Sequence, residues 1–453
     1  MKASRETIAA IRFGCGFRPG EARPDSAAAL LAALAPGAAF PTRPGPPIAE
    51  RVAAFARFND LRRANRNNAN RPEMDRIQKE IRTLFFTDIR ERVLTSVLSP
   101  HGFFERLAWF WSGHFALGGK NLLGKTLAGR FETEAIRPYL AGPFNLLLRA
   151  AVTHPAMLHY LDQDSAVGPN SPTGRSRKSG LNENLAREII ELHTLGVAAD
   201  YSQTDVRQFA ELLTGLTFDR RTGAMRFRPR RAEPGAEAVL GVSYGGGAAR
   251  LTDIYLALDA LAAHPATARR IARKLAVHFV ADTPTEALVD HLAAAFRRSG
   301  GDLRAVYGAL LEHDESWARF GEKVKQPFDF IVSSLRATDP TPAEIEGLRA
   351  PGDGPSPMVQ TARRLNQAPL FPPGPQGWPE TAESWITPQA LTVRIDWASR
   401  LARAAAARTD PRDFVDLALS DAASPAVRFV AANAAERWEG LALILASPDF
   451  NRR

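Results

Sequence analysis

The stretch that decides the fold is residues 182–196, Asn-Glu-Asn-Leu-Ala-Arg-Glu-Ile-Ile-Glu-Leu-His-Thr-Leu-Gly. At roughly 100° per residue, Leu185, Ile189 and Leu192 share one apolar arc, and most of the charged residues occupy the opposite arc. The stretch opens on asparagine, a typical N-cap residue, and closes on glycine, the residue that commonly follows the end of a helix. It therefore predicts one amphipathic helix.

The same helical period recurs along the chain. Apolar residues three and four positions apart, such as Ile77, Ile81 and Phe85, predict one or two long helices over residues 73–99. Further helices are expected at 144–153, 156–162, 203–214, 252–263, 266–280, 284–298, 302–312 and 326–337, with several more between 388 and 447.

Strand signals are confined to one region. Two short runs, 216–219 and 224–228, flank Arg-Arg-Thr-Gly and predict a hairpin, and residues 239–244 offer a third short strand. The sequence therefore predicts an all-α, mainly helical fold with a small β-hairpin insertion.

The length of the chain favours two or three domains, because 453 residues exceed what one core usually organises. The Pro- and Gly-rich loops, the longest of them at 338–388, lack the flexible composition of an interdomain linker. We therefore expect an N-terminal arm with a Pro-rich loop over 1–47, followed by a single large multi-helix domain over 48–453. The hairpin insertion would lie near 215–244.

Composition limits the classes of protein to consider. The net charge is +9, but eight of the 58 basic residues are lysine and arginine is spread throughout, which indicates a solvated basic surface more than a nucleic-acid site. With Cys15 as the one cysteine, an intramolecular disulfide and a Cys-based zinc site are excluded. No apolar run approaches the roughly 18–20 residues of a membrane span, and the N-terminus lacks the apolar core of a signal peptide. We therefore expect a soluble, cytoplasmic protein.

The polar arc of the decisive helix carries the first candidate site. Asn184, Glu188 and Glu191, at positions i, i+4 and i+7, present an amide and two carboxylates along one line. Carboxylates held close together raise the pKa of one of them, which permits acid/base catalysis. The alternative without a catalytic role is a solvated helix face on which Glu183 and Arg187, at positions i and i+4, form an ion pair.

Histidines form the second candidate. His193 lies on the apolar side of the decisive helix, and His114 follows Trp111 on the apolar face of another helix. Together with His154 and nearby carboxylates they could hold zinc or iron. The spacing of a His-Glu-x-x-His motif is absent, and a histidine on an apolar face is more often a hydrogen-bonded core residue. The cofactor therefore stays unassigned, with a divalent metal as the candidate.

The third candidate is the basic loop before the decisive helix. Arg175, Arg177 and Lys178 lie close to the expected helix N-terminus. Basic side chains beside free helix N–H groups predict a site for phosphate, sulfate or carboxylate. A solvated loop without a ligand is the commoner explanation for such a run.

Motifs along nearly the whole chain resemble one family. Residues 180–217, GLNENLAREIIELHTLGVAADYSQTDVRQFAELLTGLT, resemble the signature of the bacterial family "domain of unknown function 1800". The resemblance continues in Arg12-Phe13-Gly14, Phe110-Trp111 with His114-Phe115, Ile136-Arg137-Pro138, His154 to Leu158, His264 to Ala268, Ala272 to Leu275, Lys323 to Lys325 with Pro327-Phe328, and Gly377 to Trp385.

The resemblance implies no established activity, cofactor or catalytic residue. Members of the family are often exported and are often encoded beside a sulfatase-like family, which implies a sulfatase-like protein as a candidate partner. This chain lacks the export signal, has Ser112-Gly113 where a polar pair ending in Asn is usual, and has Leu216 in place of the usual Trp. The stretch 228–241 also lacks the family's His-Asp and Lys, so no mechanism here should depend on that histidine.

Two functional hypotheses follow. The first is a hydrolase-type enzyme with a carboxylate and histidine site on the helix over residues 182–196, which we call the signature helix. The second is a non-catalytic binding or accessory protein, in which the signature helix is a structural hydrogen-bond network. The predicted site residues are Asn184, Arg187, Glu188, Glu191, His193, His114 and Asp162.

Overall fold

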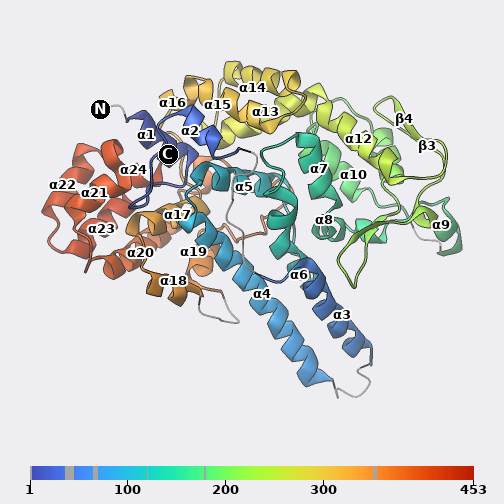
Figure 1. Ribbon diagram of the computed structural model, residues 1–453, viewed down its shortest axis with the longest axis horizontal. Helices are drawn as coiled ribbons and strands as arrows, with labels where there is room; N and C mark the ends of the chain where they lie inside the picture. The colour runs from blue at the N-terminus through green and yellow to red at the C-terminus, as the bar shows by residue number, and fades with distance from the viewer. Residues whose placement is uncertain (1–2, 36–44, 65–69, 120, 178–179, 350–354) are drawn as a thin grey trace.

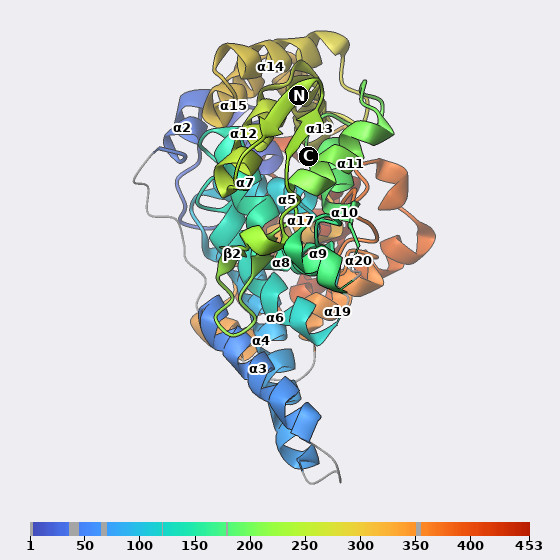
Figure 2. The ribbon, with the colours of Figure 1, turned by 90° about the vertical axis from the view of Figure 1, so that its right-hand side faces the viewer.

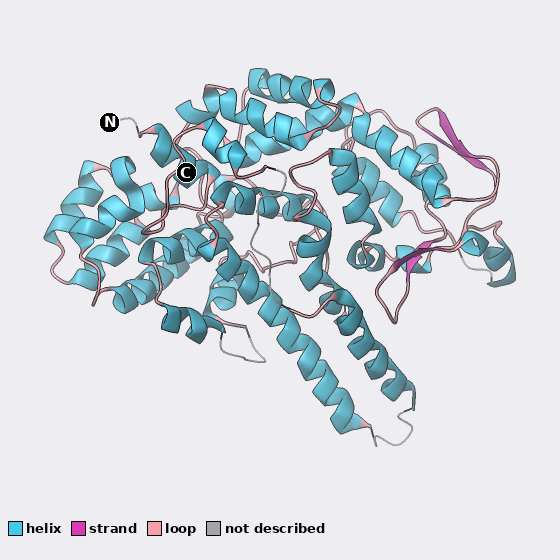
Figure 3. Ribbon diagram, in the orientation of Figure 1, coloured by secondary structure: helices cyan, strands magenta, loops and turns pink. Residues whose placement is uncertain are grey.

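The computed structural model describes residues 3–35, 45–64, 70–119, 121–177, 180–349 and 355–453. Helices make up nearly all of the regular structure in these residues, and the strands form two small antiparallel sheets at one edge (Figure 3). The predicted all-α fold with a small β insertion is therefore confirmed.

The first helical segments contribute part of their residues to the interior. Helix α1 (Arg5–Ile8) continues into η1 (Ala9–Phe13), a π-helical turn whose five residues are all buried, and α2 (Ala27–Ala32) follows. Part of the core thus comes from the range 1–47, while the division of the chain into an arm and a domain stays a prediction.

Helices α3 (Ile48–Ala64) and α4 (Arg71–Leu98) form an antiparallel pair that projects from the body (Figures 1 and 2). Ala54, Ile77 and Ile81 form a small core between them. The C-terminal part of α4 enters the body, where every residue from Asp88 to Val97 is buried.

The centre of the body is α5 (Gly102–His114), which is buried along most of its length. The first half of the chain continues with these helical segments: α6 (Leu122–Phe131), the π turn η2 (Glu132–Ile136), α7 (Phe144–Thr153), α8 (Pro155–Tyr160), the 3-10 turn η3 (Gln163–Ser165) and α9 (Pro172–Arg177). Of these, η2 packs against α5, whereas α9 lies at the outer edge of the molecule (Figure 1).

Residues 184–193 of the signature helix combine an α-helical segment with a π-helical turn. Regular helix α10 (Asn184–Glu188) passes directly into the π turn η4 (Ile189–His193). Asn182 lies just before the N-cap residue Glu183, and its Oδ1 accepts a hydrogen bond from the Asn184 N–H, the first N–H of the helix, at 2.8 Å. Gly196 follows the helix with φ of +102°, a backbone conformation that glycine adopts at little cost. The wider π turn changes the angular positions that a regular helix would give to residues 189–193.

Helix α11 (Gln203–Leu212) begins at a capping box formed by Ser202 and Asp205, and the strands follow it. Strands β1 (Leu216–Phe218) and β2 (Met225–Phe227) form the expected hairpin. The expected third strand belongs instead to a second hairpin, β3 (Ala236–Val239) with β4 (Val242–Gly245), and the 3-10 turn η5 (Pro229–Arg231) lies between the two.

Five helices cover the upper side of the body in Figure 1: α12 (Leu251–Ala263), α13 (Pro265–Phe279), α14 (Glu286–Arg298), α15 (Leu303–Glu312) and α16 (Glu315–Ala318). Two repeated His-Pro-Ala sequences are helix starts of the same kind. The Nδ1 atoms of His154 and His264 each accept a hydrogen bond at 3.1 Å from the backbone N–H two residues later. His154 therefore caps α8.

The remaining helices pack around a second hydrophobic core, which involves Val93, Phe330 and Trp397 and is separate from the larger core around α5 and α13. They are α17 (Pro327–Thr338), α18 (Pro342–Arg349), α19 (Pro357–Arg364), the 3-10 turn η6 (Ala382–Ser384), α20 (Pro388–Ala405), α21 (Pro411–Leu419), the 3-10 turn η7 (Ser420–Ala422), α22 (Pro425–Asn433), α23 (Arg437–Ala446) and α24 (Pro448–Asn451).

Candidate functional site

A cavity of about 90 Å³, lined by apolar and by titratable side chains, lies where the two hydrophobic cores meet. Phe110 of the first core and Phe328 of the second both line it. We call this space the central cavity. Its titratable lining residues come from α4, α5, η2, α13, α17, the loop before η6 and the C-terminal residue: Arg92, Arg106, His114, Glu132, Lys274, His278, Asp329, Glu380 and Arg453.

His278 and Glu380 form a histidine–carboxylate pair in the cavity wall. The Nδ1 atom of His278 lies 2.7 Å from Oε1 of Glu380, so the Nδ1–H donates to the carboxylate and Nε2 keeps its lone pair. Nε2 is buried and has no hydrogen-bond partner among the described residues. Burial lowers the pKa of His278, although Glu380 acts in the opposite direction. The imidazole is therefore neutral and oriented.

A chain of side-chain amides holds Glu380 in place. Gln326 donates from Nε2 to Oε2 of Glu380 at 3.0 Å, and Gln367 donates from Nε2 to Oε1 of Gln326 at 2.9 Å. Gln367 is fixed in turn by the Phe328 N–H, which donates to its Oε1 at 2.6 Å. These bonds tie the start of α17 to the loop that carries Glu380.

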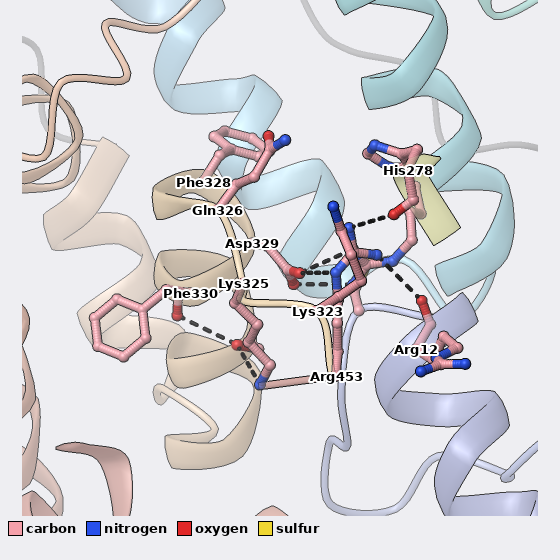
Figure 4. Close-up of polar contacts among 12 residues, drawn as sticks. Arg12, His278, Lys323, Lys325, Gln326, Phe328, Asp329, Phe330 and Arg453 are labelled. Carbon is pink, nitrogen blue, oxygen red and sulfur yellow. Dashed lines mark hydrogen bonds and ion pairs between the residues drawn. The ribbon is translucent and has the colours of Figure 1, made fainter. Parts of the chain in front are cut away.

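Lys323 adds a charge to the same carboxylate. Its Nζ lies 3.7 Å from Oε2 of Glu380 and donates to the Glu380 carbonyl and to Asp282. Burial opposes ionisation of Glu380, but His278 and Lys323 outweigh it and lower the pKa of Glu380 to about 2. Lys325, two residues on, points to the other side of the segment from Lys323 (Figure 4). Its Nζ lies over the Phe450 ring.

Lys274 precedes His278 by one turn of α13, so both project from the same face of the helix. Its amine makes no hydrogen bond or ion pair with any residue that the structure describes, although Glu380 is close enough to favour its charge. Burial and the nearby Arg270 lower the pKa of Lys274 to about 7. The cavity thus contains an amine that changes charge near neutral pH.

The cavity floor is a buried ion cluster. Arg106 donates through Nη1 and Nη2 to both oxygens of Asp329, at 2.8 and 2.9 Å, and Nε of Arg453 lies 3.4 Å from the same carboxylate. Arg453 also donates to the backbone carbonyl of His278 at 2.8 Å and to that of Arg12 at 3.4 Å (Figure 4). The cluster therefore joins α5, α17 and the C-terminal residue to the helix that carries His278.

Glu132 occupies another part of the wall. Its Oε2 accepts a hydrogen bond from Nε of Arg92 at 2.6 Å and one from the Ser112 hydroxyl at 2.9 Å. Glu132 lies in the π turn η2. The other two π turns are also next to the site, because the carbonyl of Arg12 in η1 accepts from Arg453 and the carbonyl of His193 in η4 contacts His114. Such turns are frequent at functional sites.

The outer wall is the Pro- and Gly-rich loop between α19 and η6. Pro369, Leu370, Gln376 and Trp378 of this loop line the cavity, and Gln376 is exposed to solvent. Gly377 adopts φ of +91°, and a Cβ atom there would lie 2.3 Å from the Gly113 carbonyl oxygen. Glycine is therefore required for the loop to lie against the end of α5.

The predicted site residues divide into two groups. His114 and His193 do lie together, with ring centroids 6.0 Å apart and Nε2 of His114 donating to the His193 carbonyl at 3.1 Å. Burial and Lys274 lower the pKa of both, that of His193 to about 3. Of the two, His114 lines the central cavity.

The polar face of the signature helix forms a different cluster. Arg187 bonds Glu191 at 3.0 Å, Glu183 at 3.2 Å and Gln203 of α11 at 2.9 Å, and its side chain is 41% exposed. Glu188 is partly buried, with Oε2 lacking a hydrogen-bond partner among the described residues. Burial and Glu191 raise the pKa of Glu188 to about 7.

The remaining predictions lie elsewhere. Asn184 is exposed, and Asp162 is a partly buried residue at the end of α8 with φ of 57°. Of the described residues that line the central cavity, none is Asn184, Asp162, Arg187, Glu188 or Glu191. Arg175 is exposed on α9, whereas Lys178 and the side chain of Arg177 lie outside the described residues. Over the part of the chain that is described, no three His, Cys, Asp or Glu side chains are placed to share a metal ion.

Sequence reasoning missed Lys274, His278, Glu380 and the Arg106–Asp329 pair as site residues. The family motifs offered a signal for three of these five residues, because Lys274, Glu380 and Asp329 lie in or beside segments that resemble the family pattern. Each of those segments looked like helix packing or a loop when taken alone. Their shared role becomes visible only where they meet around one cavity.

Comparison with known proteins gives the family of the chain. Within the described residues no helix is both long and apolar enough to cross a lipid bilayer. No curated protein and no solved structure matches the chain. The sequence profile of one family, described as "Protein of unknown function (DUF1800)", matches residues 8–452. The chain therefore belongs to the DUF1800 family, as its motifs predict.

Proposed function

We propose that the protein is a hydrolase-type enzyme whose reaction takes place in the central cavity, with His278 as the general base. The observation that supports this most directly is the buried Nε2 of His278, which has no hydrogen-bond partner in the described part of the chain while Glu380 accepts from Nδ1. An unpartnered buried acceptor costs stability, and a carboxylate-oriented histidine is a common form of catalytic base. The site thus differs from the one expected on the signature helix.

In the proposed step, Nε2 of His278 accepts a proton from a water molecule as the water oxygen attacks an acyl carbon. A carbon–oxygen bond forms, and the protonated imidazole then returns the proton to the leaving group as the bond to that group breaks. Glu380 remains ionised and stabilises the imidazolium. The volume of the cavity fits a small ester, lactone or amide, or the end of a larger molecule.

Lys274 supplies positive charge for the same reaction. Ion pairs compensate the cavity-lining arginines Arg92, Arg106 and Arg453, whereas the Lys274 amine has no such partner in the described structure. Its protonated form would stabilise the negative charge that develops on the acyl oxygen, or would bind an anionic group of the substrate. We therefore expect substrates that carry a carbonyl and a negative charge.

The two groups give the proposed reaction a defined pH dependence. His278 must be neutral, and its pKa is below 6.5, so activity rises as the pH rises through that value. Lys274 must be protonated, and its pKa is about 7, so activity falls as the pH rises further. The expected profile of kcat/KM is a bell whose maximum lies between the two pKa values.

The test is turnover of a panel of small chromogenic esters, lactones and amides by the full chain. His278→Gln keeps a side chain of similar size without the basic nitrogen, and we expect it to lower kcat/KM about 100-fold or more. Glu191→Gln, on the signature helix, is the matched control and should retain at least about half of the activity. Far-UV circular dichroism verifies that both variants fold.

If His278→Gln folds and turns over substrate at the wild-type rate, the proposal is wrong. If Glu191→Gln or Glu188→Gln abolishes turnover while His278→Gln does not, the site lies on the signature helix instead. The bonds of Arg187 to Glu183, Glu191 and Gln203 support the structural role of that helix, since they tie α10 to α11.

A further inference from the structure

A second polar site lies on the β-hairpin, away from the central cavity. It is an open groove of about 950 Å³ that shares no lining residue with the cavity. We call it the arginine groove. Two aspartates and five arginines supply its charged lining: Asp164, Asp219, Arg220, Arg221, Arg228, Arg230 and Arg231.

The two aspartates are already engaged. Asp164 accepts from Nη2 of Arg220 at 2.6 Å. Asp219 accepts at Oδ1 from the backbone N–H groups of Arg221 and Thr222, at 2.8 and 3.1 Å, which shapes the hairpin turn. Neither carboxylate forms an ion pair with the other groove arginines in the structure as described.

Three of the groove arginines form no close ion pair with a described residue, although Asp219 lies near enough to Arg228 to interact with its charge. Arg221, Arg228 and Arg230 are exposed, and their side chains make no hydrogen bond or ion pair with any described residue. Some exposed arginines elsewhere form ion pairs, as Arg269 and Arg273 do with Glu286, whereas the groove brings three arginines without such a pair into one hollow. Three unpaired guanidinium groups on one groove repel one another, and a ligand with several carboxylate, phosphate or sulfate groups would relieve that repulsion.

The adjacent strand points to a polypeptide among such ligands. The Arg228 N–H donates to the Gly215 carbonyl, and the Asp219 N–H donates to the Ala224 carbonyl. Hydrogen-bonded residue pairs alternate with non-hydrogen-bonded pairs in an antiparallel hairpin, so Met225 and Phe227 belong to non-hydrogen-bonded pairs. Met225 and Phe227 then direct their N–H and C=O groups to the outer edge of β2. The sheet ends at that edge, because β2 pairs with β1 and with no other described strand (Figure 3).

We propose that the arginine groove binds an acidic polypeptide segment in extended conformation, which adds to the outer edge of β2. The outward N–H and C=O groups of β2 would pair with the backbone of the polypeptide, and Arg221, Arg228 and Arg230 would bind its carboxylates. A single-stranded nucleic acid fits less well, because of the two aromatic residues that line the groove Phe218 is buried and Phe227 is partly buried, which leaves little surface for bases to stack on. This proposal does not depend on the reaction in the central cavity.

The test uses the full chain and a fluorescein-labelled peptide of about ten residues that alternates glutamate and threonine, with binding followed by anisotropy at about 50 mM salt. Replacing Arg221, Arg228 and Arg230 together by alanine should weaken binding about tenfold or more. The matched control replaces Arg297, Arg298 and Arg437 by alanine. These arginines are also exposed, and the change in net charge is the same, so binding should weaken less than about twofold.

Two further probes separate the parts of the proposal. The same peptide with alternate backbone nitrogens methylated cannot pair with β2 and should bind about fivefold more weakly or worse. A single-stranded oligonucleotide of equal length should bind more weakly than the peptide. The proposal is overturned if the peptide does not bind, if both triple variants lose affinity equally, if methylation has no effect, or if the oligonucleotide binds more tightly through the same arginines.

Discussion

The signature helix and the central cavity are both rich in titratable side chains, but the two regions differ in how deeply these side chains are buried and in how their charges are paired. On the signature helix, Arg187 compensates Glu183 and Glu191 near the surface, where solvent weakens such pairs. In the cavity wall, Asp329 compensates Arg106 and Arg453 with all three side chains no more than 3% exposed. His278 and Lys274 there keep polar atoms that no described residue satisfies.

The difference teaches that density of polar residues in a sequence is a poor guide to a reactive site. On one helix, Arg187 can neutralise Glu183 and Glu191, because residues four apart are neighbours. Glu188 is the exception on that helix, since its Oε2 has no hydrogen-bond partner among the described residues. A reactive site needs groups that stay unsatisfied inside the protein, and distant segments must enclose them. The following predictions, ordered by expected effect, test this contrast.

The largest effect is expected for Asp329→Asn. The change leaves two buried guanidinium groups without their shared carboxylate, which typically costs about 3–5 kcal/mol of the free energy of unfolding. Glu191→Gln removes a more exposed ion pair and should cost less than about 1 kcal/mol. Chemical denaturation of both variants checks the prediction, and equal losses would show that the two regions do not differ in this way.

Glu380→Gln is expected to affect activity more than stability. The amide can donate to Nδ1 of His278 and so favour the tautomer that carries its proton on Nε2, where it cannot act as a base. We expect kcat/KM to fall about 100-fold or more, as for loss of a general base. Kinetics with the best substrate of the panel measure this, and an unchanged kcat/KM in a folded variant would remove Glu380 from the proposed mechanism.

Gly377→Ala tests the loop that closes the cavity. A Cβ atom there would lie 2.3 Å from the Gly113 carbonyl oxygen, and φ is +91°, so the loop must shift at a cost of roughly 1–3 kcal/mol. Gly300→Ala is the control, because its φ is +63° but nothing lies within 4 Å of the added atom. We expect Gly377→Ala to lower activity, through the displaced Glu380, more than Gly300→Ala does.

The smallest effect is expected for Glu188→Gln, and it depends on pH. The pKa of Glu188 is raised from 4.5 to about 7, so the folded state holds a proton that the unfolded state has lost between these values. Wild-type stability from this group therefore falls as the pH rises from 4.5 to 7, and the loss persists above 7. Glutamine cannot ionise, so the variant does not undergo this loss. At pH 8 it should therefore be more stable than the wild type by on the order of 1 kcal/mol, after allowance for solvent screening.

The outcome at pH 8 separates two accounts of the signature helix. A structural network that needs the Glu188 carboxylate predicts a large loss of stability for Glu188→Gln. The Oε2 atom, which no described residue hydrogen-bonds, predicts a gain in stability, because an ionised carboxylate without a partner is unfavourable in a partly buried position. Thermal melts of the variant and of the wild type at pH 4 and pH 8 decide between these accounts.

Much of the fold was predictable because helical periodicity is local. The spacing of Ile77, Ile81 and Phe85 predicts the long helix α4, and the Arg-Arg-Thr-Gly turn predicts the first hairpin. The π turn at 189–193 was not predictable, since its geometry depends on bonds such as that from the Thr194 hydroxyl to the Ile189 carbonyl. The second hairpin was anticipated only as one extra strand.

The sequence by itself determined the helical class, the hairpin near residue 216 and, through its ordered motifs, membership of the DUF1800 family. The tertiary structure alone decided which polar groups face one another. His278 lies 102 residues from Glu380, and Arg106 lies 223 residues from Asp329. Local patterns carry no information about such pairs, because the energy that selects them comes from burying the two partners together in a low-dielectric interior.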